Sequence, residues 1–188
     1  MHEQKIWTVK KLDKKELRKT VYEKSQRLDD GYKRAARDTI VRKVLESKEF
    51  RDAGTVFVYL GTESEPGTDG IIKAAKAAGK RICVPRCVKK PFMDAVELTD
   101  ETRLVPGSFG IKEPENGRIV EPKDIDLAIV PCVSVTRDGR RLGHGGGFYD
   151  AFLKRTGAIR LCLCFARLLS ENIPVDEYDV MMDGIVTD

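Results

Sequence analysis

The stretch TVFVYLGTESEPGTDGIIKAAKAAGKRICVP, residues 55–85, determines the expected fold because its hydrophobic pattern changes period twice. Residues 55–60 are a β-branched and aromatic run, typical of a strand buried in a parallel sheet. After a polar loop, Thr68 stands at the expected N-cap of a helix, and Gly79 stands at its expected C-terminal end. Residues 81–85 then predict a second strand, so the stretch predicts a strand–helix–strand unit of a parallel α/β sheet.

The segments on either side extend this pattern. The first fifty residues predict two helices, the first starting at the capping pair Asp13 and Glu16 and the second following DDGYKR, residues 29–34. Two further apolar runs, DLAIVPCVSV from residue 126 and RLCLCFA from residue 160, predict strands. We therefore expect a three-layer α/β fold, Rossmann-like, with a mostly parallel open sheet flanked by helices.

The remaining segment and the composition complete the expected organisation. Residues 86–125 are rich in proline, glycine and charge, and MDAVEL, residues 93–98, predicts part of a short hairpin. No linker, repeat or low-complexity stretch divides the chain, so residues 1–188 are expected to form a single domain. The chain has no run of about 18 apolar residues and no signal-peptide pattern, which predicts a soluble cytoplasmic protein without a membrane partner.

The cysteines and charges exclude some functions. An odd number of cysteines without an export signal predicts reduced, buried and inert thiols. The sequence has only two histidines, His2 and His144, which argues against a structural zinc site. Residues 1–50 hold 15 Lys and Arg against 9 Asp and Glu, a net charge of +6. Such a segment attracts nucleic acid or phosphate, but solvated helix faces explain it and no nucleic-acid signature accompanies it. We therefore expect no nucleic-acid partner. The thiols are Cys83, Cys87, Cys132, Cys162 and Cys164.

The most informative motif is RLGHGGGFYDAFL, residues 141–153, which holds four glycines within five positions. It precedes a predicted helix, FYDAFLKRTG, that ends at Gly157. Glycines before a helix let main-chain N–H groups approach a phosphate closely, although a turn whose glycines adopt positive φ is the alternative. A dinucleotide fingerprint requires glycine at the position of Phe148, and a Walker loop requires Lys followed by Ser or Thr. The spacing alone therefore leaves both interpretations open.

The complete motif resembles the nucleotide-binding signature R-L-G-x-G-x-G-Y-Y-D of the 5-formyltetrahydrofolate cyclo-ligases, also called methenyltetrahydrofolate synthetases. KKELRK is similar to the amino-terminal Lys-x-x-Leu-Arg element of that family, and YLGTESEPGT is similar to its folate loop. FGIKEP resembles its central turn, and IPVDEYDVMMDGIVTD its carboxyl-terminal segment. These matches keep their order from residue 14 to residue 188, and they imply a fold that resembles the NagB/RpiA/CoA-transferase-like fold.

The resemblance implies an ATP- and Mg²⁺-dependent enzyme that cyclises 5-formyltetrahydrofolate to 5,10-methenyltetrahydrofolate and releases ADP and phosphate. In this reaction the formyl oxygen is phosphorylated by ATP, nitrogen 10 attacks the activated carbon, and phosphate leaves. Such phosphoryl transfer depends mainly on positioning and on charge neutralisation. The expected partner is therefore a small molecule, with or without a polyglutamate tail, and the expected state is a monomer.

The resemblance also implies residue roles at matching positions. Lys14 and Arg18 match the amino-terminal pair that faces the triphosphate, and their four-residue spacing places both on one helix face, where a solvated face is the alternative. Asp150 and Asp179 match the magnesium-binding acids of the family. The alternatives are a charge at a helix N-terminus for Asp150 and a surface acid for Asp179. The implied catalytic residues are Lys14, Arg18, Arg141, Tyr149 and Asp150.

Two overlapping binding sets follow from the same matches. The implied ATP-binding set is Lys14, Arg18, Arg141, Leu142, Gly143, His144, Gly145, Gly146, Gly147, Phe148 and Tyr149. The folate set has an acid that accepts pterin N–H bonds and a methionine that packs on the pterin or, alternatively, in the core. Its members are Leu60, Glu65, Met93, His144, Gly145, Gly146, Gly147 and Phe148.

Some positions depart from the family pattern. Phe148 lacks the hydroxyl of the usual first tyrosine, and His144 and Gly146 occupy variable positions where some members have basic residues. In PCVSVT, Cys132 stands where the family has glycine and Thr136 where it has aspartate. These changes motivate a second hypothesis, a catalytically weak relative that binds folate or nucleotide. A third hypothesis is a basic nucleic-acid adaptor, for which paired magnesium acids would have no use.

Overall fold

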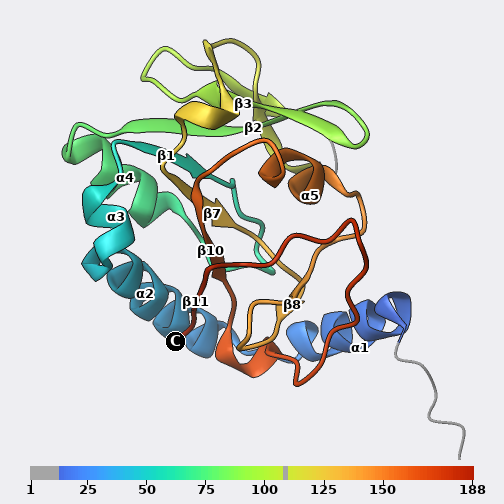
Figure 1. The fold of residues 1–188 in the computed structure, drawn as a ribbon. Helices are drawn as coiled ribbons and strands as arrows, with labels where there is room; N and C mark the ends of the chain where they lie inside the picture. Colours follow the sequence, from blue (N-terminus) through green and yellow to red (C-terminus); the bar gives the residue numbers. More distant parts are fainter. Residues whose placement is uncertain (1–12, 108–109) are drawn as a thin grey trace, which may run out of the picture.

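The computed structural model describes residues 13–107 and 110–188, and its centre is one seven-stranded sheet (Figure 1). His2, and Phe109 of the FGIKEP motif, lie outside the described residues. The strand order is β11-β10-β7-β1-β2-β3-β6, in which the first five strands run parallel and the last two pair antiparallel. This arrangement confirms the predicted mostly parallel sheet. The strands are β1 (Thr55–Val58), β2 (Arg81–Lys89), β3 (Phe92–Glu97), β6 (Ile119–Val120), β7 (Leu127–Val130), β10 (Ile159–Leu163) and β11 (Gly184–Val186).

Helices cover both faces of this sheet. Helix α4 (Asp69–Ala77) connects β1 to β2, whereas α5 (Phe148–Leu153) lies on the path from β7 to β10, in the opposite direction across the sheet. Because such parallel crossovers are right-handed, the two helices lie on opposite faces. Figure 1 shows α2 (Asp30–Glu46) and α3 (Lys48–Asp52) beside α4, with α5 across the strands from them. The result is the predicted three-layer α/β arrangement.

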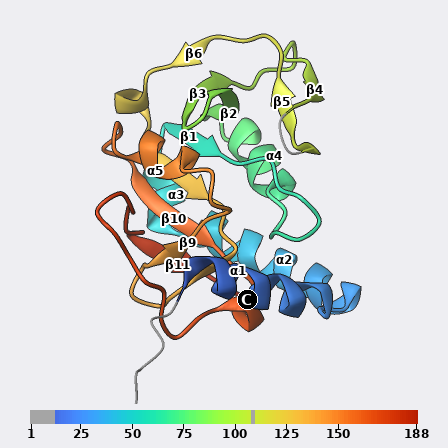
Figure 2. The same ribbon diagram turned by 90° about the vertical axis from the view of Figure 1, so that its right-hand side faces the viewer.

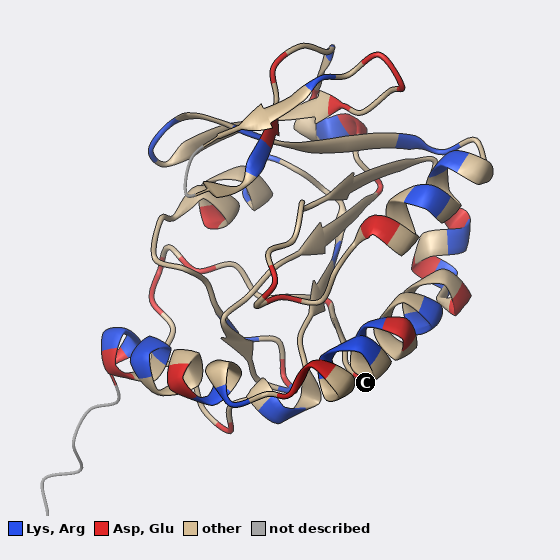
Figure 3. Cartoon of the chain, turned by 180° about the vertical axis from the view of Figure 1, so that it is seen from behind, with Lys and Arg blue, Asp and Glu red and all other residues tan. Residues whose placement is uncertain are grey.

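The amino-terminal helices begin at the capping residues that the sequence indicates. The carboxylate of Asp13 accepts a bond from Lys15 N at 3.1 Å, which starts α1 (Lys14–Gln26). The Asp29 carboxylate accepts a bond from Tyr32 N at 2.8 Å, which starts α2. Both predicted helices are confirmed, and Ser47 caps the additional short helix α3. Blue and red positions alternate along these helices (Figure 3), so their faces carry charges of both signs.

Of the predicted helix ends, the position of Thr68 is confirmed, whereas that of Gly157 is wrong. Thr68 occupies the N-cap position of α4 without capping it, because its hydroxyl donates to the Tyr59 carbonyl at 2.7 Å and so joins the helix to the end of β1. Helix α5 ends at Leu153, well before Gly157, which has no positive φ. Gly79 does adopt φ +69° directly after α4, as predicted.

The predicted strand over 126–135 is interrupted. Strand β7 ends at Val130 because Pro131 has no N–H to donate to the ladder. The chain then forms a separate two-stranded hairpin from β8 (Ser134–Val135) and β9 (Arg141–Leu142). The predicted strand within residues 93–98 is confirmed as β3, and a further hairpin pairs β4 (Leu104–Pro106) with β5 (Lys112–Pro114). Two short 3₁₀ turns are Pro122–Asp124 and Ala166–Leu168.

The hydrophobic core lies between the sheet and its helices. All four residues of β7 are completely buried, as are Val56, Phe57 and Val58 of β1. The Phe57 ring stacks on Phe152 of α5 with 4.6 Å between centroids, which fixes the short helix against the sheet. No helix within residues 13–107 and 110–188 is long and apolar enough to cross a bilayer.

The cysteines are free thiols, as predicted, and four of the five are buried. Burial raises the pKa of Cys83 to about 12. Hydrogen bonding to Cys162 and Cys164 raises the pKa of Cys132, and burial raises it further. A thiolate is the reactive form of cysteine, so these thiols are inert structural groups.

Candidate active site

The predicted site residues gather at the carboxyl ends of β1 and β7. The chain leaves these neighbouring strands in opposite directions, which makes their shared edge the switch point where ligands bind in open α/β sheets. The β1–α4 loop, residues 59–68, carries Glu65. The glycine loop, residues 143–147, follows the β8–β9 hairpin and leads into α5 (Figure 2).

The glycine loop requires glycine for reasons of backbone conformation and of space. Gly145 and Gly147 adopt φ +91° and +75°, and Gly147 is the N-cap of α5. A side-chain carbon at Gly143 would lie 2.7 Å from the guanidinium Nη1 of Arg141, and one at Gly146 would lie 2.7 Å from the Phe148 ring. A side chain at Gly143 or Gly146 would thus require Arg141 or Phe148 to move.

Arg141 is a buried cation beside this loop. Its side chain is 4% exposed, and its Nη2 donates to the Asp150 carboxylate at 2.9 Å. Nη1 donates to the Pro131 carbonyl at 3.2 Å, whereas Nε is buried without a partner among the described residues. The other Asp150 oxygen accepts a bond from Val180 N at 3.2 Å. Asp150 therefore links the glycine loop region to the carboxyl-terminal segment.

Helix α1 contributes three side chains at four-residue spacing, Lys14, Arg18 and Tyr22, which we call the α1 stripe. Lys14 Nζ lies 2.8 Å from the Asp176 carboxylate and 2.5 Å from that of Asp179. Arg18 Nε donates to the Gly143 carbonyl at 2.7 Å. Because residues i and i+4 share a helix face, the whole stripe faces the loops that form the site.

Tyr22, the third member of the stripe, is a residue that the sequence motifs missed. Its hydroxyl lies 2.7 Å from His144 Nδ1, and His144 Nε2 lies 3.1 Å from Glu65 Oε1. The α1 stripe, the glycine loop and the β1–α4 loop are therefore joined in one hydrogen-bonded chain. The signal available in the sequence was its position four residues after Arg18.

The remaining predicted residues differ in how accessible they are. Met93 is 2% exposed and belongs to the hydrophobic core, which favours the core interpretation of that residue. Leu142 is also buried, whereas Leu60, Phe148 and Tyr149 are partly buried. Burial raises the pKa of Tyr149, and the nearby Glu65 carboxylate raises it further, so Tyr149 is a neutral phenol at physiological pH.

The two predicted magnesium acids lie on adjoining segments but contact different cations. Asp150 binds Arg141 and the main chain of Val180, whereas Asp179 binds Lys14. No three His, Cys, Asp or Glu side chains come together as a metal site within residues 13–107 and 110–188. A magnesium ion on these carboxylates would therefore need water and phosphate oxygens as its other ligands, which suits this ion.

Two of the departures from the family pattern, Thr136 and Cys132, lie in the β8–β9 hairpin and just before it. Thr136 is buried, and its hydroxyl contacts the Asp138 carboxylate while accepting a bond from Arg140 N at 3.0 Å. Cys132 is buried, and its thiol donates to the Leu163 carbonyl at 3.4 Å. Both side chains are used within the fold.

The Lys14 ion pairs predict a pH-dependent attachment of α1. Burial lowers the pKa of Lys14, but the bonds to Asp176 and Asp179 outweigh it and raise this pKa above 10.5. The Asp176 pKa is lowered from 3.8, chiefly by the bond from Lys14. A raised lysine pKa stabilises the folded state below 10.5, and a lowered aspartate pKa stabilises it above 3.8. Lys14→Met should therefore lower the free energy of unfolding by a constant amount from pH 5 to pH 9.

Urea unfolding of the wild type and the variant across this pH range measures the difference. It should shrink only as the pH falls below 3.8 or rises above 10.5. Lys48→Met is the matched control, because Lys48 pairs with Asp52 within one exposed helix and such pairs contribute little. A difference that disappeared between pH 5 and 7 would contradict the assignment to these carboxylates.

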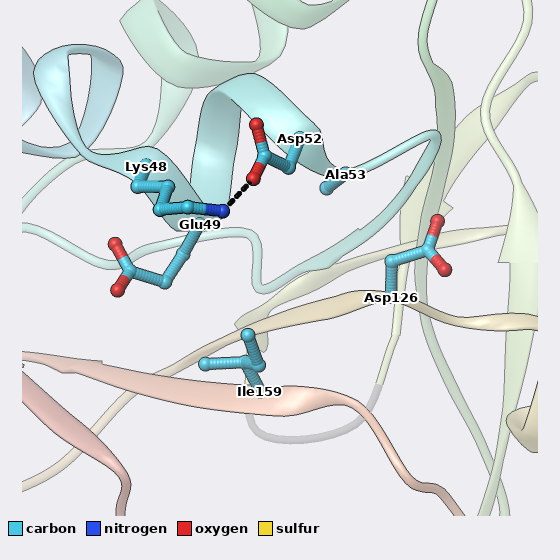
Figure 4. Close-up of a pocket in the computed structure, with 6 residues that line it drawn as sticks. All are labelled: Lys48, Glu49, Asp52, Ala53, Asp126 and Ile159. Atoms are coloured by element: carbon cyan, nitrogen blue, oxygen red, sulfur yellow. Dashed lines mark hydrogen bonds and ion pairs between the residues drawn. The ribbon is translucent and has the colours of Figure 1, made fainter.

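A small hollow at the opposite edge of the sheet is separate from this site (Figure 4). It lies at the amino ends of the strands, between α3 and the residues that begin β7 and β10. Its Asp126 carboxylate accepts bonds from Gly54 N and Thr55 N at 2.9 and 2.8 Å, and Lys48 is paired with Asp52. Because these polar groups already have partners within the protein, we do not assign a ligand to the hollow.

The fold and the site together define an α/β protein that gathers cations, carboxylates and a glycine loop at the switch point of its sheet. The chain belongs to the 5-formyltetrahydrofolate cyclo-ligase family, a family of enzymes, whose model matches residues 10–188. It is 33% identical over 149 residues to the 5-formyltetrahydrofolate cyclo-ligase of Escherichia coli (strain K12), covering 72% of this chain and 78% of that protein. The Mus musculus enzyme of the same name is 30% identical over 161 residues, covering 78% and 79%.

Solved structures show the same fold. The NMR structure of Aquifex aeolicus 5,10-methenyltetrahydrofolate synthetase matches with a TM-score of 0.82 at 28% identity, covering 92% of this chain and 88% of that one. A Mycoplasma pneumoniae 5,10-methenyltetrahydrofolate synthetase, 22% identical, matches with a TM-score of 0.77 over 94% and 99% of the two chains. These findings confirm the family resemblance and the fold expected from the sequence.

Proposed function

We propose that this protein cyclises 5-formyltetrahydrofolate to 5,10-methenyltetrahydrofolate with consumption of MgATP. The observation that carries the proposal, beside family membership, is that one glycine loop contacts two chemically different groups. Its Gly143 carbonyl binds Arg18 of α1, while its His144 binds the buried Glu65 carboxylate. A cationic side suited to phosphates and an acidic side suited to a pterin thus meet at one loop.

The chemistry explains the need for both sides. ATP supplies a phosphoryl group that turns the formyl oxygen into a leaving group. Nitrogen 10 of the folate then attacks the activated formyl carbon, loses its proton, and phosphate leaves as the five-membered ring closes. The protein has to place the formyl oxygen in line with the γ-phosphate, neutralise charge on the phosphates, and exclude water.

In this proposal the triphosphate lies against the glycine loop and the cations Lys14, Arg18 and Arg141. The unpartnered Nε of Arg141 supports this, because a buried N–H without an acceptor is costly and an anion would supply one. Leu142 and Phe148 hold the loop from either end. The main-chain N–H groups around Gly145, Gly146 and Gly147 provide further donors to phosphate.

Asp150 and Asp179 are the proposed magnesium ligands. Carboxylate oxygens are hard ligands of the kind that Mg²⁺ prefers. In the structure each carboxylate already pairs with a cation, Asp150 with Arg141 and Asp179 with Lys14. On binding, each acid would share its charge between the ion and its cation.

Glu65 is the proposed anchor for the pterin, whose amino and ring N–H groups are donors. Leu60 and Phe148 offer apolar surface beside it. Tyr149, a neutral phenol, is a hydrogen-bond donor in the same place. Met93 is a residue of β3 and contributes to the site only indirectly, as part of the hydrophobic core.

The proposal extends to the state of the protein. We propose a single domain over residues 1–188, which is supported by one hydrophobic core cluster to which α1, α2 and the sheet all contribute. We propose further that it acts as a monomer in the cytoplasm without nucleic-acid or membrane partners. The polyglutamate tail of the substrate is not needed for the chemistry described.

A second candidate, a relative that binds folate without turnover, is motivated by Thr136 and Cys132. The geometry favours the enzyme, because Thr136 bonds within the hairpin and Cys132 bonds to the Leu163 carbonyl of β10, which leaves the α1 stripe and Asp150 intact. The third candidate, a nucleic-acid adaptor, has no supporting observation in the site.

The deciding experiment follows the absorbance of the conjugated methenyl product. Purified protein is mixed with 5-formyltetrahydrofolate in three conditions: with MgATP, with ATP and a chelator, and without nucleotide. We expect product only with MgATP, together with one phosphate released per ring closed. Folate binding without product in any condition would refute turnover and favour the binding-only relative.

A further inference from the structure

Glu65 is a buried carboxylate whose oxygens are unequally occupied. The residue is 5% exposed, and its Oε2 accepts bonds from Thr62 N and Thr62 Oγ1, each at 3.0 Å. Its Oε1 contacts only His144 Nε2 among the described residues, at 3.1 Å. Since each carboxylate oxygen accepts about two bonds, Oε2 is filled and Oε1 keeps one site for a donor from a ligand.

The partners of His144 determine which ring nitrogen carries the proton. A carboxylate only accepts hydrogen bonds, so the short contact to Glu65 requires a proton on Nε2. In the neutral ring Nδ1 is then an acceptor, and the Tyr22 hydroxyl at 2.7 Å is its donor. Burial raises the pKa of Tyr22, and the Glu65 charge raises it further, so the phenol keeps its proton. Two further charged groups, Arg18 and Arg141, lie beside the glycine loop, and the Arg18 guanidinium faces Gly145.

We propose that Tyr22 and His144 are positioning residues that hold the Glu65 carboxylate with one Oε1 site open toward a pterin N–H. Tyr22 fixes the Nε2–H tautomer of His144, and His144 fixes the carboxylate. This inference rests on the proposed function, in which Glu65 anchors the pterin. It adds a residue from α1 that otherwise has no role in folate binding, and it connects the helix carrying the phosphate-binding cations to the folate side of the site.

The tautomer can be observed directly, because the chain contains only two histidines. With ¹⁵N-labelled histidine, long-range ¹H–¹⁵N correlation spectra distinguish Nε2–H, Nδ1–H and doubly protonated rings, and His144→Ala assigns the signal. We expect Nε2–H for His144 in the wild type at pH 7.5. Tyr22→Phe removes the donor to Nδ1 and should therefore add a population of the Nδ1–H ring. A wild-type Nδ1–H ring, or identical spectra in Tyr22→Phe, would overturn the proposal.

Kinetics provide the second readout. Tyr22→Phe and His144→Ala should each raise the KM for 5-formyltetrahydrofolate by about five- to tenfold, the effect of one lost hydrogen bond, with little change in kcat or in the KM for ATP. His144→Gln should restore most of the folate KM, because its amide N–H can donate to Oε1. Equal increases in both KM values would instead indicate a distorted glycine loop and would contradict a positioning role.

Tyr32→Phe is the matched control. The Tyr32 hydroxyl also contacts a carboxylate, that of Asp188 at 3.1 Å, but on α2 outside the site. It should leave the folate KM and the His144 spectrum unchanged. Failure of the proposed function is recognised separately: if Glu65→Gln left the folate KM unchanged, Glu65 would not be the anchor. If Glu65→Gln raised that KM while Tyr22→Phe altered neither spectrum nor KM, only the positioning role would be wrong.

Discussion

Asp150→Asn should reduce MgATP-dependent turnover by about 10³-fold, because a bound metal contributes several kcal/mol of transition-state stabilisation and 1.36 kcal/mol corresponds to tenfold in rate. The amide keeps the size of the carboxylate, but its single oxygen can accept a bond from only one of Arg141 Nη2 and Val180 N, and its nitrogen then faces the other donor. It loses the charge that would hold Mg²⁺. Initial rates measured over a range of Mg²⁺ at saturating ATP should show a higher Mg²⁺ requirement together with the lower maximal rate.

Loss of folding must be separated from loss of metal binding, since the buried Arg141 also loses its counter-charge in this variant. Asp183→Asn is the matched control, because Asp183 pairs with Arg160 at 2.7 Å at the edge of the sheet and lies outside the site. It should retain near wild-type activity. Near-normal turnover of a folded Asp150→Asn protein, verified by circular dichroism and thermal unfolding, would remove Asp150 from the magnesium site.

Glu65→Gln should raise the KM for 5-formyltetrahydrofolate by about 10- to 100-fold while changing the KM for ATP much less, because hydrogen bonds to a charged group contribute about 1.5–3 kcal/mol. The amide nitrogen would also face a donor, either on Thr62 or on His144. The carboxylate position would therefore be lost together with its charge. Steady-state kinetics with each substrate varied in turn provide the measurement.

Glu97→Gln is the control for this variant. Glu97 lies on β3 and pairs with Arg81 at 3.1 Å, so it tests the removal of a partly buried glutamate charge elsewhere in the fold. Its folate KM should match that of the wild type. An equal rise in the KM for ATP and for folate in Glu65→Gln would contradict a specific role at the pterin.

The main strands of the sheet could be predicted from sequence because they are short apolar runs, and such runs are stable only when they are buried in the sheet. The errors arose where one residue outweighs the local pattern. Pro131 ends β7 inside a continuous apolar run, and the Thr68 hydroxyl bonds to the end of β1 in preference to its own helix. Helix α5 ends at Leu153, before the predicted Gly157. The bond of Thr68 depends on a tertiary contact that a local window does not contain, whereas the effect of Pro131 is local and was open to prediction.

The site residues likewise include some that were predicted from sequence and some that were not. The glycine loop, Arg18, Glu65 and Asp150 were predicted from family-like motifs. In the structure Arg18 and Glu65 bond to the glycine loop and Asp150 bonds to Arg141, although the roles of these residues stay predictions. Tyr22 lies in no motif, and only the contact with His144, 122 residues away in sequence, draws attention to it. The burial of Met93 was likewise not visible from sequence, because a methionine suits both a core and a ligand surface.

The α1 stripe also bears on how the protein is made. Lys14 and Arg18 leave the ribosome early, yet their partners lie 165 and 125 residues later in the chain. At the usual speed of synthesis, the first helix waits on the order of ten seconds before those partners exist. A nascent chain that already has β1, α4 and β2 therefore still lacks a working centre. A chain that stops before Asp176 would lack both carboxylates that pair with Lys14.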